Sequence, residues 1–196
     1  MRTRRDSSID PNMENVRAAM VREHLDDIPI HPLPAGYSMR FYRRGDKKTW
    51  VRIHRQAEPL IDVTAKRFDR EFSHDLPSLP KRCHFLVAPD GSDVGTITSW
   101  YRPRYHHRPW GQIHWVAIGP EHRGKGLSRS IMTVAMLRLK QLHHRRAMLL
   151  TNSPRLAAIK TYLHFGFAPD MHDPDAAKAW ALVAKALPHP KLKAYR

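Results

Sequence analysis

The stretch WVAIGPEHRGKGLSRSIM, residues 115–132, decides the fold. A β-rich run leads through a turn containing Gly124 and Gly126 directly into a long segment of helical periodicity. Backbone amides at the start of a helix have no intrahelical partner, and the helix end carries about half a positive elementary charge, so such a turn can bind phosphate oxygens. Full positive charges are added around it by Arg123, Lys125 and Arg129. The stretch therefore predicts a pyrophosphate cradle.

The glycine turn differs from two well-known phosphate-binding motifs. A Walker-type loop is excluded because the turn lacks the Gly-Lys-Ser/Thr ending. The dinucleotide fingerprint fails because no third glycine stands at position 129. A simple glycine-containing loop stays open as the alternative, since this turn taken alone is a weak motif.

The rest of the chain predicts alternating strands and helices. Strands are expected in GYSMRFY (36–42), on both sides of a Pro-Asp-Gly-Ser turn in 83–101, and over 111–119 and 147–152. Helices are expected over about 47–56, 62–72, 127–144, 154–162 and 173–187. Loops are expected at 73–80 and 102–111. The stretch 13–36 combines a weakly helical part, with Val16 and Met20 at helical spacing, and a proline-punctuated segment that favours extended backbone.

Composition bounds the class of protein. The 196 residues carry 34 Lys and Arg against 18 Asp and Glu, a formal charge of +16 that points to a polyanionic partner. No apolar run approaches the roughly 18 residues of a membrane span, and no secretory signal follows Met1, so a cytoplasmic protein without membrane contact is expected. The lone Cys83 excludes an intramolecular disulfide and a cysteine-based zinc site and is expected to be a buried thiol.

Two motifs of this chain match, in order and separation, two motifs of one known protein family. Glu121–Gly126 lies on a Q/R-x-x-G-x-G/A turn, with Glu121 as a departure, and Ala158, Tyr162, Gly166 and Phe167 match A-x-x-x-Y-x-x-x-G-F. Over about residues 37–169 the chain resembles the GNAT family of acetyl-coenzyme A-dependent N-acetyltransferases. The resemblance implies an α/β (α+β) fold with a mixed, largely antiparallel central sheet, helices on both faces and a cofactor cleft after the fourth strand. An additional C-terminal helix departs from many members.

The same resemblance implies a set of site residues. The strand backbone at Val116, Ala117 and Ile118 would bind the pantetheine arm. The pyrophosphate would be held by the turn and its first helical residues: Arg123, Gly124, Lys125, Gly126, Leu127, Ser128 and Arg129. Arg155 stands where many members have an asparagine that contacts the cofactor. Tyr162 would be the general acid, because a tyrosine of pKa about 10 keeps its proton at neutral pH and can donate it to a departing thiolate.

The sequence does not identify the general base uniquely. Some family members place a glutamate early in the fourth strand, where this chain has Gln112, whose amide cannot accept the proton. His114 lies two residues on and projects from the same strand face, with an ordinary histidine pKa near 6.5. We therefore take His114 as the candidate base, and a water chain as the alternative.

The expected function is transfer of an acetyl group from acetyl-CoA, the co-substrate, to a primary amine of an unidentified acceptor by direct attack. The alternative is a non-catalytic nucleic-acid-binding module or an acetyl-CoA sensor on the same scaffold. It stays open because the segment between Val94 and Pro169 contains twelve Lys and Arg but only one acidic residue, Glu121.

The paired histidines at 106–107 and 143–144 point apart and predict no metal site. The expected organisation is a basic tail (1–12), an extension (13–36), the acetyltransferase domain (37–170) and a C-terminal helix and tail (171–196). The oligomeric state stays open.

Overall fold

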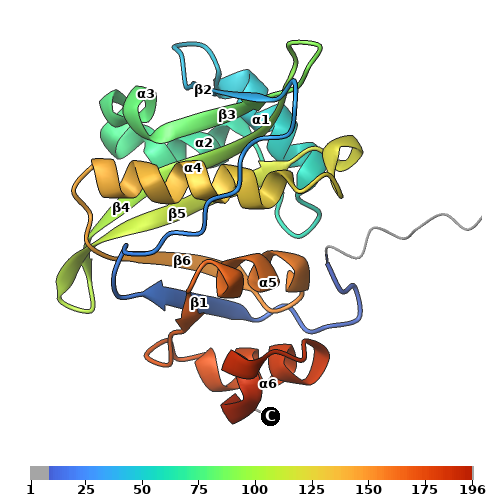
Figure 1. The fold of residues 1–196 in the computed structure, drawn as a ribbon, viewed down its shortest axis with the longest axis vertical. Helices are drawn as coiled ribbons and strands as arrows, with labels where there is room; N and C mark the ends of the chain where they lie inside the picture. Colours follow the sequence, from blue (N-terminus) through green and yellow to red (C-terminus); the bar gives the residue numbers. More distant parts are fainter. Residues whose placement is uncertain (1–8, 196) are drawn as a thin grey trace, which may run out of the picture. The chain divides into compact units, whose positions relative to one another are not determined.

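The computed structural model, drawn as a ribbon in Figure 1, describes residues 9–195. The chain divides into two units. The central unit is Ile30–His144. The terminal unit combines Met1–Pro29 with Arg145–Arg196. Most of the basic tail predicted at 1–12, its first eight residues, lies outside the described residues. Within the described part of the chain, no helix has both the length and the apolar character to cross a membrane.

Four antiparallel strands form the sheet of the central unit: β2 (Ser38–Phe41), β3 (Cys83–Val87), β4 (Asp93–Tyr105) and β5 (Arg108–Ile118). The predicted hairpin between β3 and β4 is confirmed, with Gly91 at φ +82° in its turn. The loop predicted over 102–111 is wrong, because β4 and β5 continue to a two-residue turn at His106 and His107, both with positive φ. Pro103 lies where the register shifts between Arg102 and Tyr105, so its missing N–H falls at an irregularity of the ladder.

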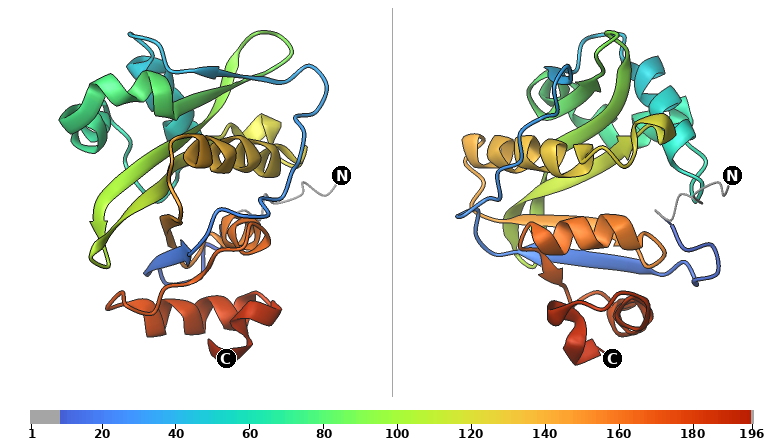
Figure 2. Two further views of the ribbon diagram at one scale, coloured as in Figure 1. Left: turned by 60° about the vertical axis from the view of Figure 1, so that its left-hand side comes forward. Right: turned by 45° about the vertical axis from the view of Figure 1, so that its right-hand side comes forward.

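Helices cover both faces of this sheet (Figure 2). Consecutive residues of a strand point to opposite faces, and Ser99 donates its hydroxyl to the Ala135 carbonyl of α4 (Leu127–Gln141) while the next residue, Trp100, packs on Phe72 of α2 (Ala65–Phe72). The helix α1 (Lys47–Ala57) lies on the same face as α2, where Trp50 contacts Phe72 and Phe68. The sheet is thus a middle layer, as the sequence predicts.

Short helices replace the loop predicted at 73–80. A 3₁₀ helix (Ser73–Ser78) leads into α3 (Leu79–Arg82), whose first residue is fully buried. The prolines that suggested a loop are compatible with this geometry, because Pro80 lies in the first turn of α3, where its missing N–H has no helical partner to lose.

Three antiparallel strands form the sheet of the terminal unit, in the order β6 (Ala147–Asn152), β1 (Arg17–Arg22) and β7 (Ala168–Pro169). The helical reading of 13–36 is wrong at β1. Ala18, Ala19 and Met20 are consecutive and fully buried, as in a central strand covered on both faces, and such a run shows no strand alternation in the sequence. The helical spacing of Val16 and Met20 was therefore misleading.

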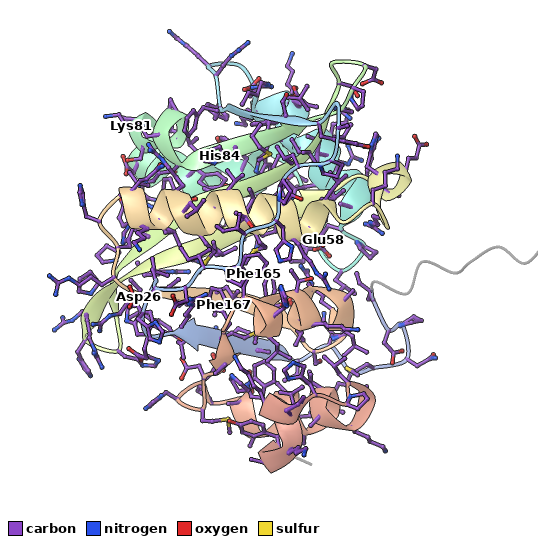
Figure 3. All side chains as sticks on the ribbon, viewed as in Figure 1. Asp26, Glu58, Lys81, His84, Phe165 and Phe167 are labelled. Carbon is purple, nitrogen blue, oxygen red and sulfur yellow. The ribbon has the colours of Figure 1, made fainter. Side chains whose placement is uncertain are left out.

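The terminal unit also contains the helices α5 (Leu156–His164) and α6 (Ala176–Ala186) and a 3₁₀ helix (Pro190–Tyr195). The predicted C-terminal helix is confirmed as α6, whose Trp180 is fully buried. Phe165 and Phe167, labelled in Figure 3, are fully buried after α5. The fold class is therefore confirmed as mixed α/β, and each pair of neighbouring strands inside the two described units is antiparallel.

Candidate active site

The glycine turn at 123–126 has the backbone that the sequence predicts. Gly124 and Gly126 have φ of +76° and +77°, the left-handed region that only glycine adopts at little cost. Gly126 is the N-cap residue of α4, and no atom lies within 4 Å of a Cβ built at either glycine. The amides at the start of α4 therefore open onto a turn with no side chains over these two residues.

The cations around this turn have different surroundings. Arg123 donates to the carbonyl oxygens of Ile118 (3.3 Å) and Ala57 (3.0 Å), so its guanidinium ties the turn to the ends of β5 and α1. The Lys125 ammonium lies 3.4 Å from the hydroxyl of Tyr37 and is exposed. Ser128 and Arg129 are exposed in the first turn of α4. The Arg123 backbone N–H donates to the Pro120 carbonyl oxygen (3.2 Å), so Arg123 holds the shape of the turn, whereas the exposed Lys125 and Arg129 are placed to contribute positive charge.

A β-bulge in β5 is a feature that the sequence analysis missed. Thr98 pairs with His114 and Thr96 with Ala117, so Trp115 and Val116 together face Ile97 alone. Trp115 has φ +47°, an unusual conformation for a bulky residue. The extra residue has no partner of its own on β4 and interrupts the ladder between the two strands. A tryptophan gives no local signal for this conformation, so the sequence could not reveal it.

A buried hydrogen-bond chain holds the bulge. The Thr96 hydroxyl donates to the Trp115 carbonyl oxygen (3.3 Å) and lies 2.7 Å from Nε2 of His54 on α1. The Trp115 ring packs edge-on against Trp50, with centroids 4.9 Å apart, and against His54. Strained backbone persists where its surroundings over-determine it, and these contacts from α1 and β4 do so here.

His114 lies just before the bulge and is surrounded by polar partners. Its Nε2 is 3.1 Å from Oε2 of Glu71 on α2, and its Nδ1 is 3.1 Å from Nε2 of Gln112. The Gln112 carbonyl oxygen in turn accepts from Nε of Arg102 at 3.0 Å. Glu71 was not singled out in the sequence, because nothing in a helical segment 43 residues earlier indicates that it meets β5.

Burial, hydrogen bonds and neighbouring charges together set the protonation of this pair. Desolvation lowers the pKa of His114 below the ordinary histidine value, although the hydrogen bond and charge of Glu71 oppose the shift. Desolvation by itself would raise the pKa of Glu71, but the hydrogen bond and charge of His114, the Trp115 side chain and the charge of Arg67 together hold it at about 2. At neutral pH the pair is therefore a carboxylate beside a neutral imidazole.

Tyr162 lies on α5 in the terminal unit, at 8% exposure. Burial raises its pKa above the ordinary tyrosine value, with the charge of Arg155 opposing, so the phenol keeps its proton at neutral pH. Arg155 itself stands at the start of α5. Gly166 (φ +81°) lies just beyond the end of α5, and a Cβ there would lie 3.2–3.4 Å from the Arg22 guanidinium. The positive φ therefore favours glycine at this position of the second motif, and an added side chain would also crowd Arg22.

The two units carry different parts of the predicted site. The central unit holds His114, the strand residues Val116–Ile118 and the turn Arg123–Arg129. The terminal unit holds Arg155 and Tyr162. Cys83 is buried in the core of the central unit, and burial raises the pKa of its thiol to about 12, as expected for an inert side chain.

Comparison with known proteins finds similarity to acetyltransferases. The family model for the acetyltransferase (GNAT) family matches residues 47–167. A mycothiol acetyltransferase from Actinosynnema mirum is 25% identical over 160 residues, which cover 76% of this chain and 50% of that protein. One from Salinispora tropica is 27% identical over 156 residues, covering 72% and 48%. The chain spans about half the length of the curated relatives it matches.

Solved structures show the same fold. A GCN5-related N-acetyltransferase from Sphaerobacter thermophilus superposes with a TM-score of 0.65 at 20% identity, over 81% of this chain and 50% of that chain. A tandem GNAT protein from the clavulanic acid biosynthesis pathway gives a TM-score of 0.56 at 14% identity, over 82% and 52%.

Proposed function

Since this chain belongs to the GNAT family of acetyltransferases, we propose that it transfers the acetyl group of acetyl-CoA to a primary amine by direct attack. The observation that carries this proposal is the turn through Gly124 and Gly126, left-handed at both glycines and leading straight into α4. A helix start with open backbone amides and nearby cations suits the pyrophosphate of coenzyme A. In this proposal the pantetheine arm binds along the backbone of Val116–Ile118, the part of β5 that begins inside the bulge.

The reaction needs two proton transfers. The amine nitrogen attacks the thioester carbon, the C–S bond breaks, and the sulfur leaves as a thiolate that takes a proton. Tyr162 is the donor in this proposal, because its buried phenol is protonated at neutral pH. No covalent intermediate with the enzyme is involved.

The attacking amine must first lose a proton. An alkylammonium of pKa about 10.4 is mostly protonated at pH 7, and freeing its lone pair costs about 4.6 kcal/mol. His114 is the acceptor in this proposal, since its imidazole is neutral and a carboxylate lies beside it to stabilise the imidazolium.

The acceptor is assigned here only as a primary amine. The curated relatives are named mycothiol acetyltransferases, so mycothiol-related amines belong in the first panel of acceptors. Amino sugars, small polyamines and peptide amino termini complete the panel.

The experiment is calorimetric titration with acetyl-CoA at low and moderate salt, followed by a thiol-release assay across the amine panel. We expect micromolar binding and thiol release with at least one amine. The buried Cys83 adds no background to the thiol reading of the folded protein. Absence of binding at both salt concentrations would overturn the proposal, and binding without turnover of any amine would indicate an acetyl-CoA sensor instead.

A further inference from the structure

The donor and the acceptor of each hydrogen bond in the chain from Arg102 to Glu71 can be assigned. Arginine can only donate, so the Gln112 atom that faces Arg102 Nε at 3.0 Å must be the carbonyl oxygen. The Gln112 amide nitrogen therefore faces Nδ1 of His114, at 3.1 Å, and donates to it. Nδ1 accordingly bears the lone pair, and the ring proton is on Nε2, which donates to Glu71 Oε2 at 3.1 Å. The partners at the two ends fix a single tautomer of His114.

The charged groups that face this histidine come from two elements, and neutral side chains come from a third. Glu71 and Arg67 face it from α2, Arg102 from β4, and β5 contributes Gln112 and Trp115. Glu71 is 19% exposed and His114 15%, and the second carboxylate oxygen, Oε1, lies 3.0 Å from Nε of Arg67. A largely buried carboxylate hydrogen-bonded to a neutral imidazole is arranged to stabilise that imidazole once it gains a proton.

We propose that Glu71 is the positioning residue of the proposed acetyl transfer, holding His114 with its Nδ1 lone pair available to the acceptor amine and balancing the charge that His114 gains. This inference rests on the proposed function and adds Glu71 to it. Glu71 touches neither the acetyl donor nor the amine in this role and acts through His114.

The proton of the acceptor amine moves to Nδ1 of His114 in this step. An ammonium group of the acceptor replaces the Gln112 amide as the donor to Nδ1, because a charged donor makes the stronger hydrogen bond. The N–H bond breaks, the proton bonds to Nδ1, and the electron pair stays on nitrogen for attack on the thioester carbon. The imidazolium then donates from Nε2 to the Glu71 carboxylate, and Gln112 stays bound to Arg102 through its carbonyl oxygen.

Two variants move the charge beside His114 in opposite directions. Glu71→Gln keeps the size of the side chain and an oxygen that can accept from Nε2 but removes the negative charge. Arg67→Met removes the cation that competes with His114 for the Glu71 carboxylate, so His114 then lies beside a carboxylate without a second positive partner. A matched control is Asp69→Asn, which neutralises an exposed carboxylate on the same helix that is paired with Lys47 instead of His114.

The measurement is the pH profile of kcat/KM for the amine, together with the KM for acetyl-CoA. For Glu71→Gln we expect a fall of about 10- to 100-fold in kcat/KM and an acidic midpoint lower by about one pH unit. For Arg67→Met we expect the acidic midpoint to rise. In both variants the KM for acetyl-CoA stays within about twofold, and Asp69→Asn matches wild type.

The outcomes separate this inference from the proposed function. If wild type turns over an amine but the acidic midpoint is the same in Glu71→Gln and Arg67→Met, a merely structural role of Glu71 is indicated and the inference is overturned. If wild type binds acetyl-CoA and acetylates no amine, the proposed function fails and this inference fails with it. Opposite shifts of the midpoint in the two variants would support the role of Glu71.

Discussion

Replacing Gly124 by aspartate puts a carboxylate where the pyrophosphate of acetyl-CoA is proposed to lie. The position is exposed, and a new Cβ there meets no atom within 4 Å, so the added side chain causes no clash in the folded protein. The φ of +76° adds backbone strain, which aspartate tolerates better than most residues. The main effect of Gly124→Asp is therefore expected on cofactor binding.

The magnitude follows from the charges. Two unit charges about 4 Å apart repel by about 1 kcal/mol in a water-like dielectric, and a pyrophosphate carries two negative charges. The total is about 2 kcal/mol, or a roughly 30-fold weaker Kd at about 1.4 kcal/mol for each factor of ten. The added charge is exposed, so the loss should shrink as salt is raised.

Calorimetric titration of acetyl-CoA at two salt concentrations measures this loss. Gly45→Asp is the matched control, because Gly45 also has positive φ (+101°), is exposed and has no atom within 4 Å of a Cβ. It adds the same charge and at least the same strain away from the turn, and we expect wild-type affinity. An unchanged Kd in Gly124→Asp, or an equal loss in Gly45→Asp, would refute the placement of the pyrophosphate.

Three further predictions follow from buried groups. Tyr162→Phe should lower kcat at least about 100-fold in the thiol-release assay while the Kd for acetyl-CoA stays within twofold, and an unchanged kcat would remove Tyr162 as the acid. Thr96→Val removes the hydroxyl that links His54 to the Trp115 carbonyl and should raise the KM for acetyl-CoA about tenfold, whereas Thr98→Val, on the same strand and equally buried, should not. Burial, with the charge of Arg138, lowers the pKa of His84 (Figure 3) to about 4. Between pH 6.5 and 4 the unfolded chain therefore binds a proton that the folded protein excludes, and stability falls as pH falls, by about 3 kcal/mol in total. Urea titrations should show a shallower fall for His84→Phe, and equal slopes would contradict this account.

Two features of the fold, the strand β1 and the bulge at Trp115, depend on tertiary contacts and have no signal in the local sequence. The strand β1 is covered on both faces, so its Ala18–Met20 run carries no alternation, and only pairing with β6 and β7 makes it a strand. The bulge at Trp115 exists because α1 and β4 hold an unfavourable conformation in place. These features depend on partners distant in sequence, which no local pattern encodes.

The sequence by itself determined the elements whose causes are local. A left-handed turn needs glycine at 124 and 126, a helix start leaves its amides open, and the C-terminal helix carries its own apolar stripe, so these could be read from residues a few positions apart. The identity of the second member of the His114 pair was decided only by the tertiary structure. Glu71 and His114 are 43 residues apart, and the packing of α2 against the sheet brings carboxylate and imidazole within 3.1 Å. A hydrogen bond between side chains depends on distances of tenths of an ångström, which only the folded packing fixes.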